Sequence, residues 1–187
     1  REGLANNPHE RATSLNVVGS EVDRLSRLVN DVLDLAKLEA DRFTLRAEEV
    51  DLSQLIEQAH RSLAEEAKRR DIDFECVLQA NSVIVTDGDR LLQIVTNLLI
   101  NALQWTPNSG RIELKLSLEE EKIIITVQDS GPGIAPELQN DVFRPFFSRA
   151  GMSGTGLGLA IAHELAGALG GDLTFVSGAD CGTQFVL

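Results

Sequence analysis

The chain has 187 residues, of which 43% are hydrophobic and 25% are charged, and its formal net charge at pH 7 is −12. This length and composition allow one good hydrophobic core with an appendage, or at most two small domains. The acidic charge argues against nucleic acid or an anionic membrane as a partner, because both need a basic surface, and an acidic protein that binds a polyphosphate needs a divalent cation.

The cysteines and the hydropathy pattern indicate where the chain works. Cys76 and Cys181 lie far apart and outside any Cys-x-x-Cys or Cys/His cluster, so we expect neither a disulfide framework nor a zinc site, and a reducing compartment fits best. No apolar run is long enough to span a membrane, and no signal peptide is recognisable. Since the chain starts at Arg1 without a methionine, we expect a cytoplasmic piece of a longer protein, whose full length can still be anchored in a membrane.

The first segment predicts one long helix that packs in a bundle. Its apolar residues recur at alternating steps of three and four, which is the spacing of a coiled coil or a four-helix bundle. A helix over residues 8–40 would begin with Asn7 as its cap and Pro8 at its first position. One helix cannot bury this stripe alone, so it either packs on the domain behind it or bundles with other helices, which the heptad spacing favours. The stripe consists of Leu15, Val18, Val22, Leu25, Val29, Val32 and Ala36.

Behind this helix, with a boundary near Arg46, helices and strands follow one another. Helices and mixed strands in this order predict an α+β fold, in which a two-layer α/β sandwich follows the long bundle-forming helix. Helices are expected from a cap at Asp51 or Ser53, and at 89–104, 136–143 and 156–169. Strands are expected within 43–50, at 72–78 and 83–86, at 111–118 and 122–128 as a hairpin, and at 173–177 and 183–186 as a final pair.

A glycine-rich run over 154–159 leads straight into an apolar-periodic stretch. Glycines let the backbone approach an anion closely, and the free N–H groups of a first helical turn favour negative charge, so the run suits a turn that holds phosphate. It lacks the lysine of a Walker loop and the spacing of a dinucleotide fold. Taken alone, such a turn is more often tight packing than a nucleotide site.

Two asparagines and one aspartate are further candidates. Asn97 and Asn101 are four residues apart on the helix over 89–104 and therefore project from the same face, either as surface residues or as oxygen ligands of magnesium. Asp129 ends a strand and is followed by a Gly-x-Gly loop, which is either a common turn or a carboxylate that accepts a hydrogen bond from an exocyclic amine such as that of adenine. Thr183, beside Gly182, adds a second polar group for a base.

In their order along the chain, these motifs closely resemble the conserved boxes of sensor histidine kinases. The segment from Asp23 to Ala40 is similar to the second helix of that family's dimerisation and phosphotransfer hairpin. The resemblance implies that residues 1–46 are the C-terminal part of this hairpin, and that residues 47–187 are the catalytic domain with the Bergerat ATP-binding fold. The matching motifs are Asn97-x-x-x-Asn101, Asp129-x-Gly131-x-Gly133, Phe143-x-Pro145-Phe146, Gly154-x-Gly156-x-Gly158 and Gly182-Thr183.

The resemblance also assigns roles to residues. It implies that Asn101 ligates magnesium and that Asn97 lies one turn earlier near the phosphates, so these two are the expected catalytic residues. It implies that Asp129 recognises the adenine amine, and that Phe143 and Phe146 anchor a mobile lid over 148–153. The nucleotide-binding residues expected in this way are Asn97, Asn101, Trp105, Asp129, Gly131, Gly133, Ile134, Phe146, Arg149, Gly154, Thr155, Gly156, Leu157, Gly158, Leu159 and Thr183.

The chain departs from the family pattern after the second asparagine. Gln104 stands where the family usually has a lysine near the phosphates, so ATP affinity would depend more on magnesium and on Arg144 or Arg149. Trp105 stands at the position of an aromatic residue beside the base, and is either that stacking residue or a core aromatic under the sheet.

The family's acceptor histidine is also missing. It lies in a Ser/Thr-His-Glu context on the first hairpin helix, and no such helix precedes Pro8. His9, His60 and His163 lie outside that context, and we assign none of them a catalytic role.

These observations predict a fragment of a sensor histidine kinase. It would bind Mg-ATP and transfer the γ-phosphoryl group to a histidine supplied by the absent helix, for relay to an aspartate of a response regulator. The full-length kinase would be a homodimer. One alternative is an ATP-hydrolysing relative, although those enzymes carry a glutamate where Asn97 stands to activate water. The other is a non-catalytic module for nucleotide sensing or dimerisation.

Overall fold

The computed structural model describes residues 44–147, 155–178 and 181–187, and six further residues of the first segment. All six are helical, as the helix predicted over 8–40 requires, and the rest of that prediction lies outside the described residues. Among the six, Leu28 is half-buried against the domain core, whereas the side chains of Val22, Val29, Val32 and Leu33 are 45–58% exposed. These four apolar side chains are therefore available to a further helix. The sixth residue is Ala36.

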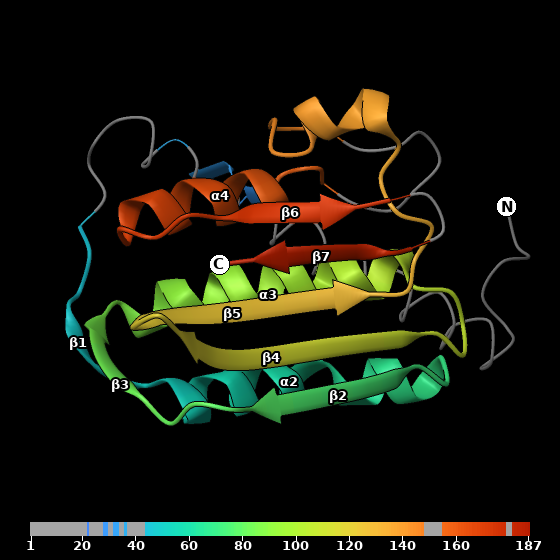
Figure 1. Cartoon of the computed structure of the whole chain (residues 1–187). Coiled ribbons are helices and arrows are strands. Elements are labelled where there is room, and N and C mark those ends of the chain that lie inside the picture. Colours follow the sequence, from blue (N-terminus) through green and yellow to red (C-terminus); the bar gives the residue numbers. More distant parts are fainter. Residues whose placement is uncertain are drawn as a thin grey trace, which may run out of the picture.

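Within the described residues, five strands form one mixed sheet in the order β2-β4-β5-β7-β6 (Figure 1). β2 runs parallel to β4, and the other neighbouring pairs are antiparallel. β1 and β3 pair with each other in a separate antiparallel ribbon, so the strand predicted at 83–86 does not join the main sheet. The strands are β1 Glu48–Asp51, β2 Asp73–Leu78, β3 Val83–Thr86, β4 Arg111–Glu119, β5 Lys122–Asp129, β6 Thr174–Ser177 and β7 Thr183–Val186.

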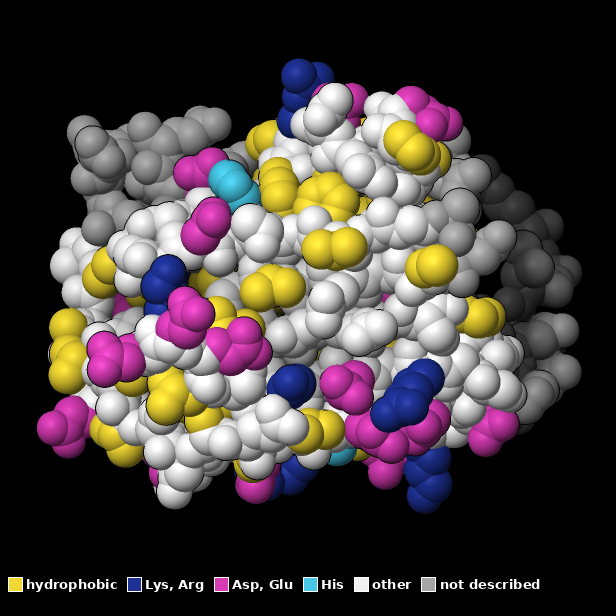
Figure 2. Space-filling view, in the orientation of Figure 1, with side chains coloured by type: hydrophobic (Ala, Val, Ile, Leu, Met, Phe, Trp, Pro, Cys, Tyr) yellow, Lys and Arg dark blue, Asp and Glu magenta, His cyan; other side chains and the backbone are white. Residues whose placement is uncertain are grey.

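Helices cover one face of this sheet. α2 Leu52–Arg69, α3 Gly88–Trp105 and α4 Gly158–Ala168 lie behind the sheet in Figure 1, and a short 3-10 helix, η1, spans Pro136–Asp141. The opposite face carries both charged and apolar side chains, as Figure 2 shows. The predicted two-layer sandwich is confirmed, and its core lies between the layers. The largest fully buried side chains are Leu52, Ile56, Ile94, Leu98, Leu99, Ile112, Leu114, Leu116, Leu157, Ile161, Leu165 and Phe185. In the described part of the chain, no helix has the length and apolar character that crossing a membrane would need.

Aspartate caps fix where the first two helices of the domain begin. Asp51 accepts a hydrogen bond from the backbone three residues on at 3.1 Å, so it caps α2 in preference to Ser53. Asp87 does the same for α3 at 3.1 Å, and that helix therefore begins at Gly88, one residue earlier than predicted. The second carboxylate oxygen of Asp87 accepts from the backbone N–H of Arg46 at 2.9 Å. This hydrogen bond attaches the chain at the predicted domain boundary to the start of α3.

Turn geometry explains the other differences from the predicted boundaries. Glu119 still pairs with Lys122, so the hairpin turn consists of Glu120 and Glu121, whose φ angles of 48° and 68° suit the twist of a two-residue hairpin. α4 begins two residues later than predicted, at Gly158, because φ at Gly156 is +67° and lies outside the helical region. η1 is a 3-10 helix and ends at residue 141, two residues earlier than predicted.

The C-terminal end of α3 is capped from outside the helix, which leads to a first prediction. α3 has no basic residue in its last turn, and the guanidinium of Arg70 donates to the carbonyl oxygens of Leu103 and Thr106 instead. Hydrogen bonds from a charged donor contribute about 1.5–3 kcal/mol each. We therefore expect Arg70→Met to lower the free energy of unfolding by about 2 kcal/mol in urea titrations. Arg69→Met is the control, since Arg69 is exposed and should change stability by less than about 0.5 kcal/mol. Equal effects of the two changes would contradict this prediction.

Candidate nucleotide-binding site

Three polar side chains form a row across the inner face of the sheet. The strand register places Asp129 of β5 opposite Thr183 of β7, and Thr183 opposite Ser177 of β6. Asp129 and Thr183 are 4% and 5% exposed, and Ser177 is half-buried. Residues that face each other across adjacent strands point to the same side of a sheet. Polar groups from three strands therefore meet at one end of the core, where an apolar row would otherwise be expected.

The carboxylate of Asp129 is held by the backbone through one of its two oxygens. Oδ1 accepts from the N–H of Gly131 at 2.8 Å and from the N–H of Thr183 at 3.3 Å. Oδ2 has no hydrogen bond to any described residue. Burial raises the pKa of this carboxyl above its ordinary value, and the two N–H groups partly offset that rise. The site therefore offers a fixed, desolvated acceptor with one oxygen left for a ligand that donates a hydrogen bond.

The raised pKa of Asp129 predicts a pH-dependent difference in stability. Because its pKa is higher in the folded than in the unfolded state, this group makes the protein less stable as pH rises from the unfolded value of about 3.9 through the folded value. The asparagine in Asp129→Asn does not titrate. The free energy of unfolding of the variant minus that of the wild type should therefore become more positive as pH rises through this window and stay constant above it. Urea unfolding between about pH 4 and 7 measures the difference, and a difference independent of pH would contradict the assignment.

The loop after Asp129 passes close to the end of α3. A Cβ added to Gly131 would lie 2.9 Å from the carbonyl oxygen of Trp105 and 2.8 Å from Oδ1 of Asp129, so any larger residue would displace one of them. Gly133 and Ile134 follow, and the N–H of Ile134 donates to Oγ of Ser177 at 2.8 Å. The loop is thus fixed on one side by helix α3 and on the other by strand β6.

Trp105 is half-buried at the last position of α3. Among the described residues, it belongs neither to the buried core nor to the hydrophobic side chains packed against that core. The alternative that Trp105 is a core aromatic is therefore wrong. Its backbone carbonyl lies at the end of α3 that closely approaches Gly131.

The two asparagines of α3 differ in their hydrogen bonds. The Nδ2 group of Asn97 donates to the carbonyl oxygen of Gly158 at 3.0 Å, which fixes the orientation of the amide and leaves Oδ1 as its acceptor. Asn101, also half-buried, has no side-chain hydrogen bond to a described residue. No group of His, Cys, Asp or Glu residues suited to a metal occurs in the described part of the chain. An amide oxygen is a hard ligand that suits magnesium, which keeps waters and phosphate oxygens in its shell, so these residues fit that ion.

The two ends of the segment over 147–155 lie against each other. Phe146 has a φ of 62° and Gly156 a φ of 67°, and a Cβ added to Gly156 would lie 2.7 Å from the carbonyl carbon of Phe146. Leu157, directly after this contact, is fully buried, and its N–H donates to the hydroxyl of Thr155 at 3.2 Å. Gly158 and Leu159 continue into α4 and are half-buried. The lid predicted over 148–153, together with Arg149 and Gly154, lies outside the described residues.

The two phenylalanines expected beside the lid have different environments. Phe143 is half-buried; its ring stacks on His163 with centroids 4.6 Å apart and meets Phe175 edge-on at 5.7 Å. Phe146 is 64% exposed. Phe143 therefore attaches this part of the chain to the core, whereas Phe146 stands at its surface.

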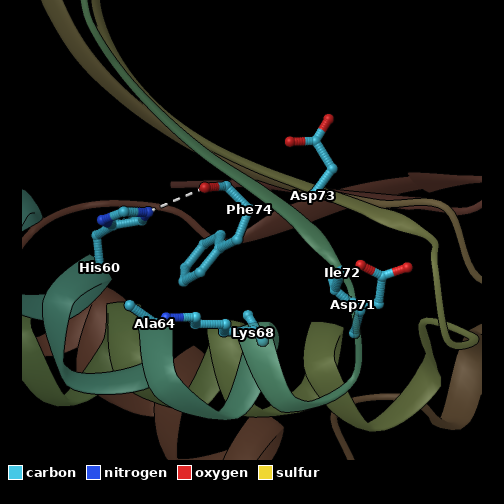
Figure 3. Close-up of a pocket in the computed structure, with 8 residues that line it drawn as sticks. His60, Ala64, Lys68, Asp71, Ile72, Asp73 and Phe74 are labelled. Atoms are coloured by element: carbon cyan, nitrogen blue, oxygen red, sulfur yellow. Dashed lines mark hydrogen bonds between the residues drawn. The ribbon is translucent and has the colours of Figure 1, made fainter.

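His60 belongs to a different part of the molecule, at the other edge of the sheet. Its ring contacts Phe74 with centroids 4.3 Å apart, and its Nε2 lies 3.1 Å from the carbonyl oxygen of Phe74 (Figure 3). Both residues line an open groove of about 340 Å³ between α2 and β2, together with Ala64, Ala67, Lys68, Asp71, Ile72 and Asp73.

Ser177 and Gln139 are residues of this site that the sequence analysis missed. Ser177 contacts Ile134, Gly182 and Thr183 through its hydroxyl, and Nε2 of Gln139 donates to the carbonyl oxygen of Ile134 at 3.0 Å. No motif singles out either residue. Only the register of β6 against β7 and the position of η1 bring them to the loop.

Comparison with known proteins identifies relatives of this chain. Residues 86–187 match the family described as histidine kinase-, DNA gyrase B-, and HSP90-like ATPase. The swarming motility regulation sensor protein RssA of Serratia marcescens is 35% identical over 174 residues, which cover 91% of this chain and 37% of RssA. The chain spans between 29% and 41% of the length of RssA and three other curated relatives that it matches.

Two solved structures are similar to this fold. The crystal structure of full-length ShkA in complex with AMPPNP matches with a TM-score of 0.84 and 30% identity, over 96% of this chain and 38% of that chain. Histidine kinase ThkA, crystallised with the response regulator protein TrrA, matches with a TM-score of 0.76 and 26% identity, over 97% of this chain and 51% of that chain.

Proposed function

Because the chain belongs to the family of histidine kinase-, DNA gyrase B- and HSP90-like ATPases and is homologous to sensor histidine kinases, we propose that it is the catalytic ATP-binding portion of such a kinase. It binds Mg-ATP and directs the γ-phosphoryl group to a histidine on a helix outside this chain. Relay to an aspartate of a response regulator follows. The observation that carries the proposal is the buried Asp129 carboxylate, whose Oδ2 remains available to a ligand.

The base end of the proposed site is built on the row of Asp129 and Thr183. Oδ2 of Asp129 accepts from the exocyclic amine of adenine, and Thr183 adds a second polar contact. Gly131, Gly133 and Ile134 let the chain pass close to the base. Trp105, outside the core and at the end of α3 whose backbone meets this loop, stacks its indole on the base or on its rim.

The phosphate end lies between α3 and α4. Asn101 and Asn97 offer amide oxygens to magnesium and its water shell, and the N-terminal turn of α4 offers backbone N–H groups to phosphate. When bound, the ion neutralises phosphate charge, so the residues act mainly by positioning. Gln104 supplies no charge in place of the usual lysine, and Arg144 or Arg149 compensates. The further residues proposed here are Phe146, Gly154, Thr155, Gly156, Leu157, Gly158 and Leu159.

The proposed partners follow from the exposed first segment and from the relatives. Residues 1–46 form the C-terminal part of the dimerisation hairpin and residues 47–187 the catalytic domain. The exposed side chains of Val22, Val29, Val32 and Leu33 are suited to a homodimeric bundle. A response regulator receiver domain is the final acceptor of the phosphoryl group. ATP is the substrate and ADP the product, and both are cytoplasmic. Nucleic acid is not a partner.

Titration calorimetry with Mg-ATP tests the proposal. We expect saturable binding, a loss of at least about tenfold in affinity when EDTA removes magnesium, and little EDTA sensitivity left in Asn101→Ala. Asn140→Ala, at an exposed position, is the matched control and should behave as wild type. The separately supplied acceptor hairpin should become phosphorylated.

Three results would overturn parts of this proposal. Absence of binding would favour a non-catalytic dimerisation module. Appreciable turnover of ATP by the chain alone would favour an ATP-hydrolysing relative, although Asn97, whose amide donates to Gly158, lacks the carboxylate of a general base. Stable phosphohistidine on the chain itself would show that the acceptor is one of its own histidines.

A further inference from the structure

The hydroxyl of Ser177 has three polar neighbours. Its Oγ lies 2.8 Å from the backbone nitrogen of Ile134, 3.0 Å from the carbonyl oxygen of Gly182 and 3.0 Å from Oγ1 of Thr183. A hydroxyl carries one proton and two lone pairs. Three contacts therefore use its whole hydrogen-bonding capacity.

Only one arrangement of protons makes all three contacts hydrogen bonds. The N–H of Ile134 can only donate, and the carbonyl of Gly182 can only accept, so the proton of Ser177 goes to Gly182. The hydroxyl of Thr183 must then donate its own proton to Ser177. This leaves Oγ1 of Thr183 with lone pairs alone, between Ser177 and Asp129 in the row across the sheet.

We propose that Ser177 is a positioning residue that selects the 6-amino purine by holding Thr183 as a hydrogen-bond acceptor. The inference rests on the proposed ATP-binding function. With Ser177 in place, Oδ2 of Asp129 and Oγ1 of Thr183 are both acceptors, so the base end suits the two N–H donors of an exocyclic amine. A 6-oxo purine would place its O6, a third acceptor, against them, and the unpaired acceptors would oppose binding.

Loss of the serine hydroxyl changes this selectivity in one direction. In Ser177→Ala the proton of Thr183 is free to turn toward the base and pair with O6 of a 6-oxo purine. It can also turn toward Oδ2 of Asp129 and compete there with the adenine amine. Both changes weaken the preference for the 6-amino base.

Ser177 also fixes the loop at Ile134, and this second role needs its own control. Gln139 holds the same loop, because its Nε2 donates to the carbonyl oxygen of Ile134 at 3.0 Å. It also lies 3.5 Å from the backbone carbonyl oxygen of Ser177, but it has no hydrogen bond to the Ser177 hydroxyl or to Thr183. Gln139→Leu should therefore loosen the loop without releasing the proton of Thr183. We expect it to weaken binding of both purine classes by the same factor.

The test is calorimetry on the whole chain with Mg-ATP and with Mg-ITP, the 6-oxo analogue. We expect the wild type to bind Mg-ATP about 100-fold more tightly than Mg-ITP. In Ser177→Ala this ratio of affinities should fall about tenfold, which corresponds to one charge-assisted or unpaired contact. Ser177→Thr, which keeps the hydroxyl, should restore the ratio. Gln139→Leu should lower both affinities and leave the ratio unchanged.

A second variant keeps the test independent of the loop. Thr183→Val removes the threonine hydroxyl but leaves Ser177 bonded to Ile134 and Gly182. It should reduce the ratio by itself, and adding Ser177→Ala to it should change the ratio no further, because the two act through one hydroxyl pair. Full additivity, or an unchanged ratio in Ser177→Ala, would overturn the inference while ATP binding by the wild type stands. A wild type that binds neither nucleotide would instead overturn the proposed function.

Discussion

Asp129→Asn should reduce the affinity for Mg-ATP by about 100-fold while the fold is retained. The change replaces the free carboxylate oxygen, a hydrogen-bond acceptor, by an NH₂ group, which is a donor. Oδ1 of Asp129 faces two backbone donors, the N–H groups of Gly131 and Thr183. The amide oxygen of the introduced asparagine must stay there, since a nitrogen at that position would face two donors. Its NH₂ group is then turned toward the ligand, where it opposes the adenine amine.

Titration calorimetry measures this loss, and the fluorescence of Trp105, the single tryptophan, gives a second readout. Asp172→Asn is the matched control, since Asp172 is exposed and precedes β6 at the end opposite Ser177, and it should leave the affinity unchanged. Urea unfolding of Asp129→Asn at pH 7 should show no loss of stability, because the change also removes a buried charge. Unchanged ATP affinity in the variant would show that Asp129 does not contact the base.

Gly156→Val should impair nucleotide binding by at least about tenfold, because the site cannot hold a side chain there. The φ of +67° is strained for a β-branched residue, and the added Cβ would lie 2.7 Å from the backbone of Phe146. Either Phe146 or the start of α4 must shift. Because the turn proposed to bind phosphate begins at this contact, its backbone N–H groups would move from their positions.

The fold should persist in Gly156→Val, since Gly156 lies outside the buried core. Circular dichroism and urea unfolding check this, together with calorimetry for binding. Gly167→Ala, in α4, is the control: an added Cβ there meets no atom within 4 Å, and helix propensity predicts a gain of roughly 0.5–1 kcal/mol in stability. Binding by Gly156→Val equal to that of the control would contradict a role for Gly156 in nucleotide binding.

Local signals in the sequence were enough to predict most of the fold. The caps at Asp51 and Asp87 satisfy the first N–H groups of their helices within three residues along the chain, so the chain itself specifies where α2 and α3 begin. Hydrophobic periodicity placed the helices and strands in the right order. The motif order from Asn97 to Thr183 pointed to the family. All these signals act over a few residues or depend only on the identity and order of the residues.

The tertiary structure decided how distant parts of the chain meet. The row of Asp129, Thr183 and Ser177 depends on the register of three strands, and no local pattern sets the register of β5 against β7, since Asp129 and Thr183 are 54 residues apart. The same is true of Arg70, which caps a helix that is not its own. The sequence therefore determined the family, the elements and the residues that carry charge or amide groups. Packing across the sheet decided which of these groups remain available to a ligand and which are used up by their neighbours.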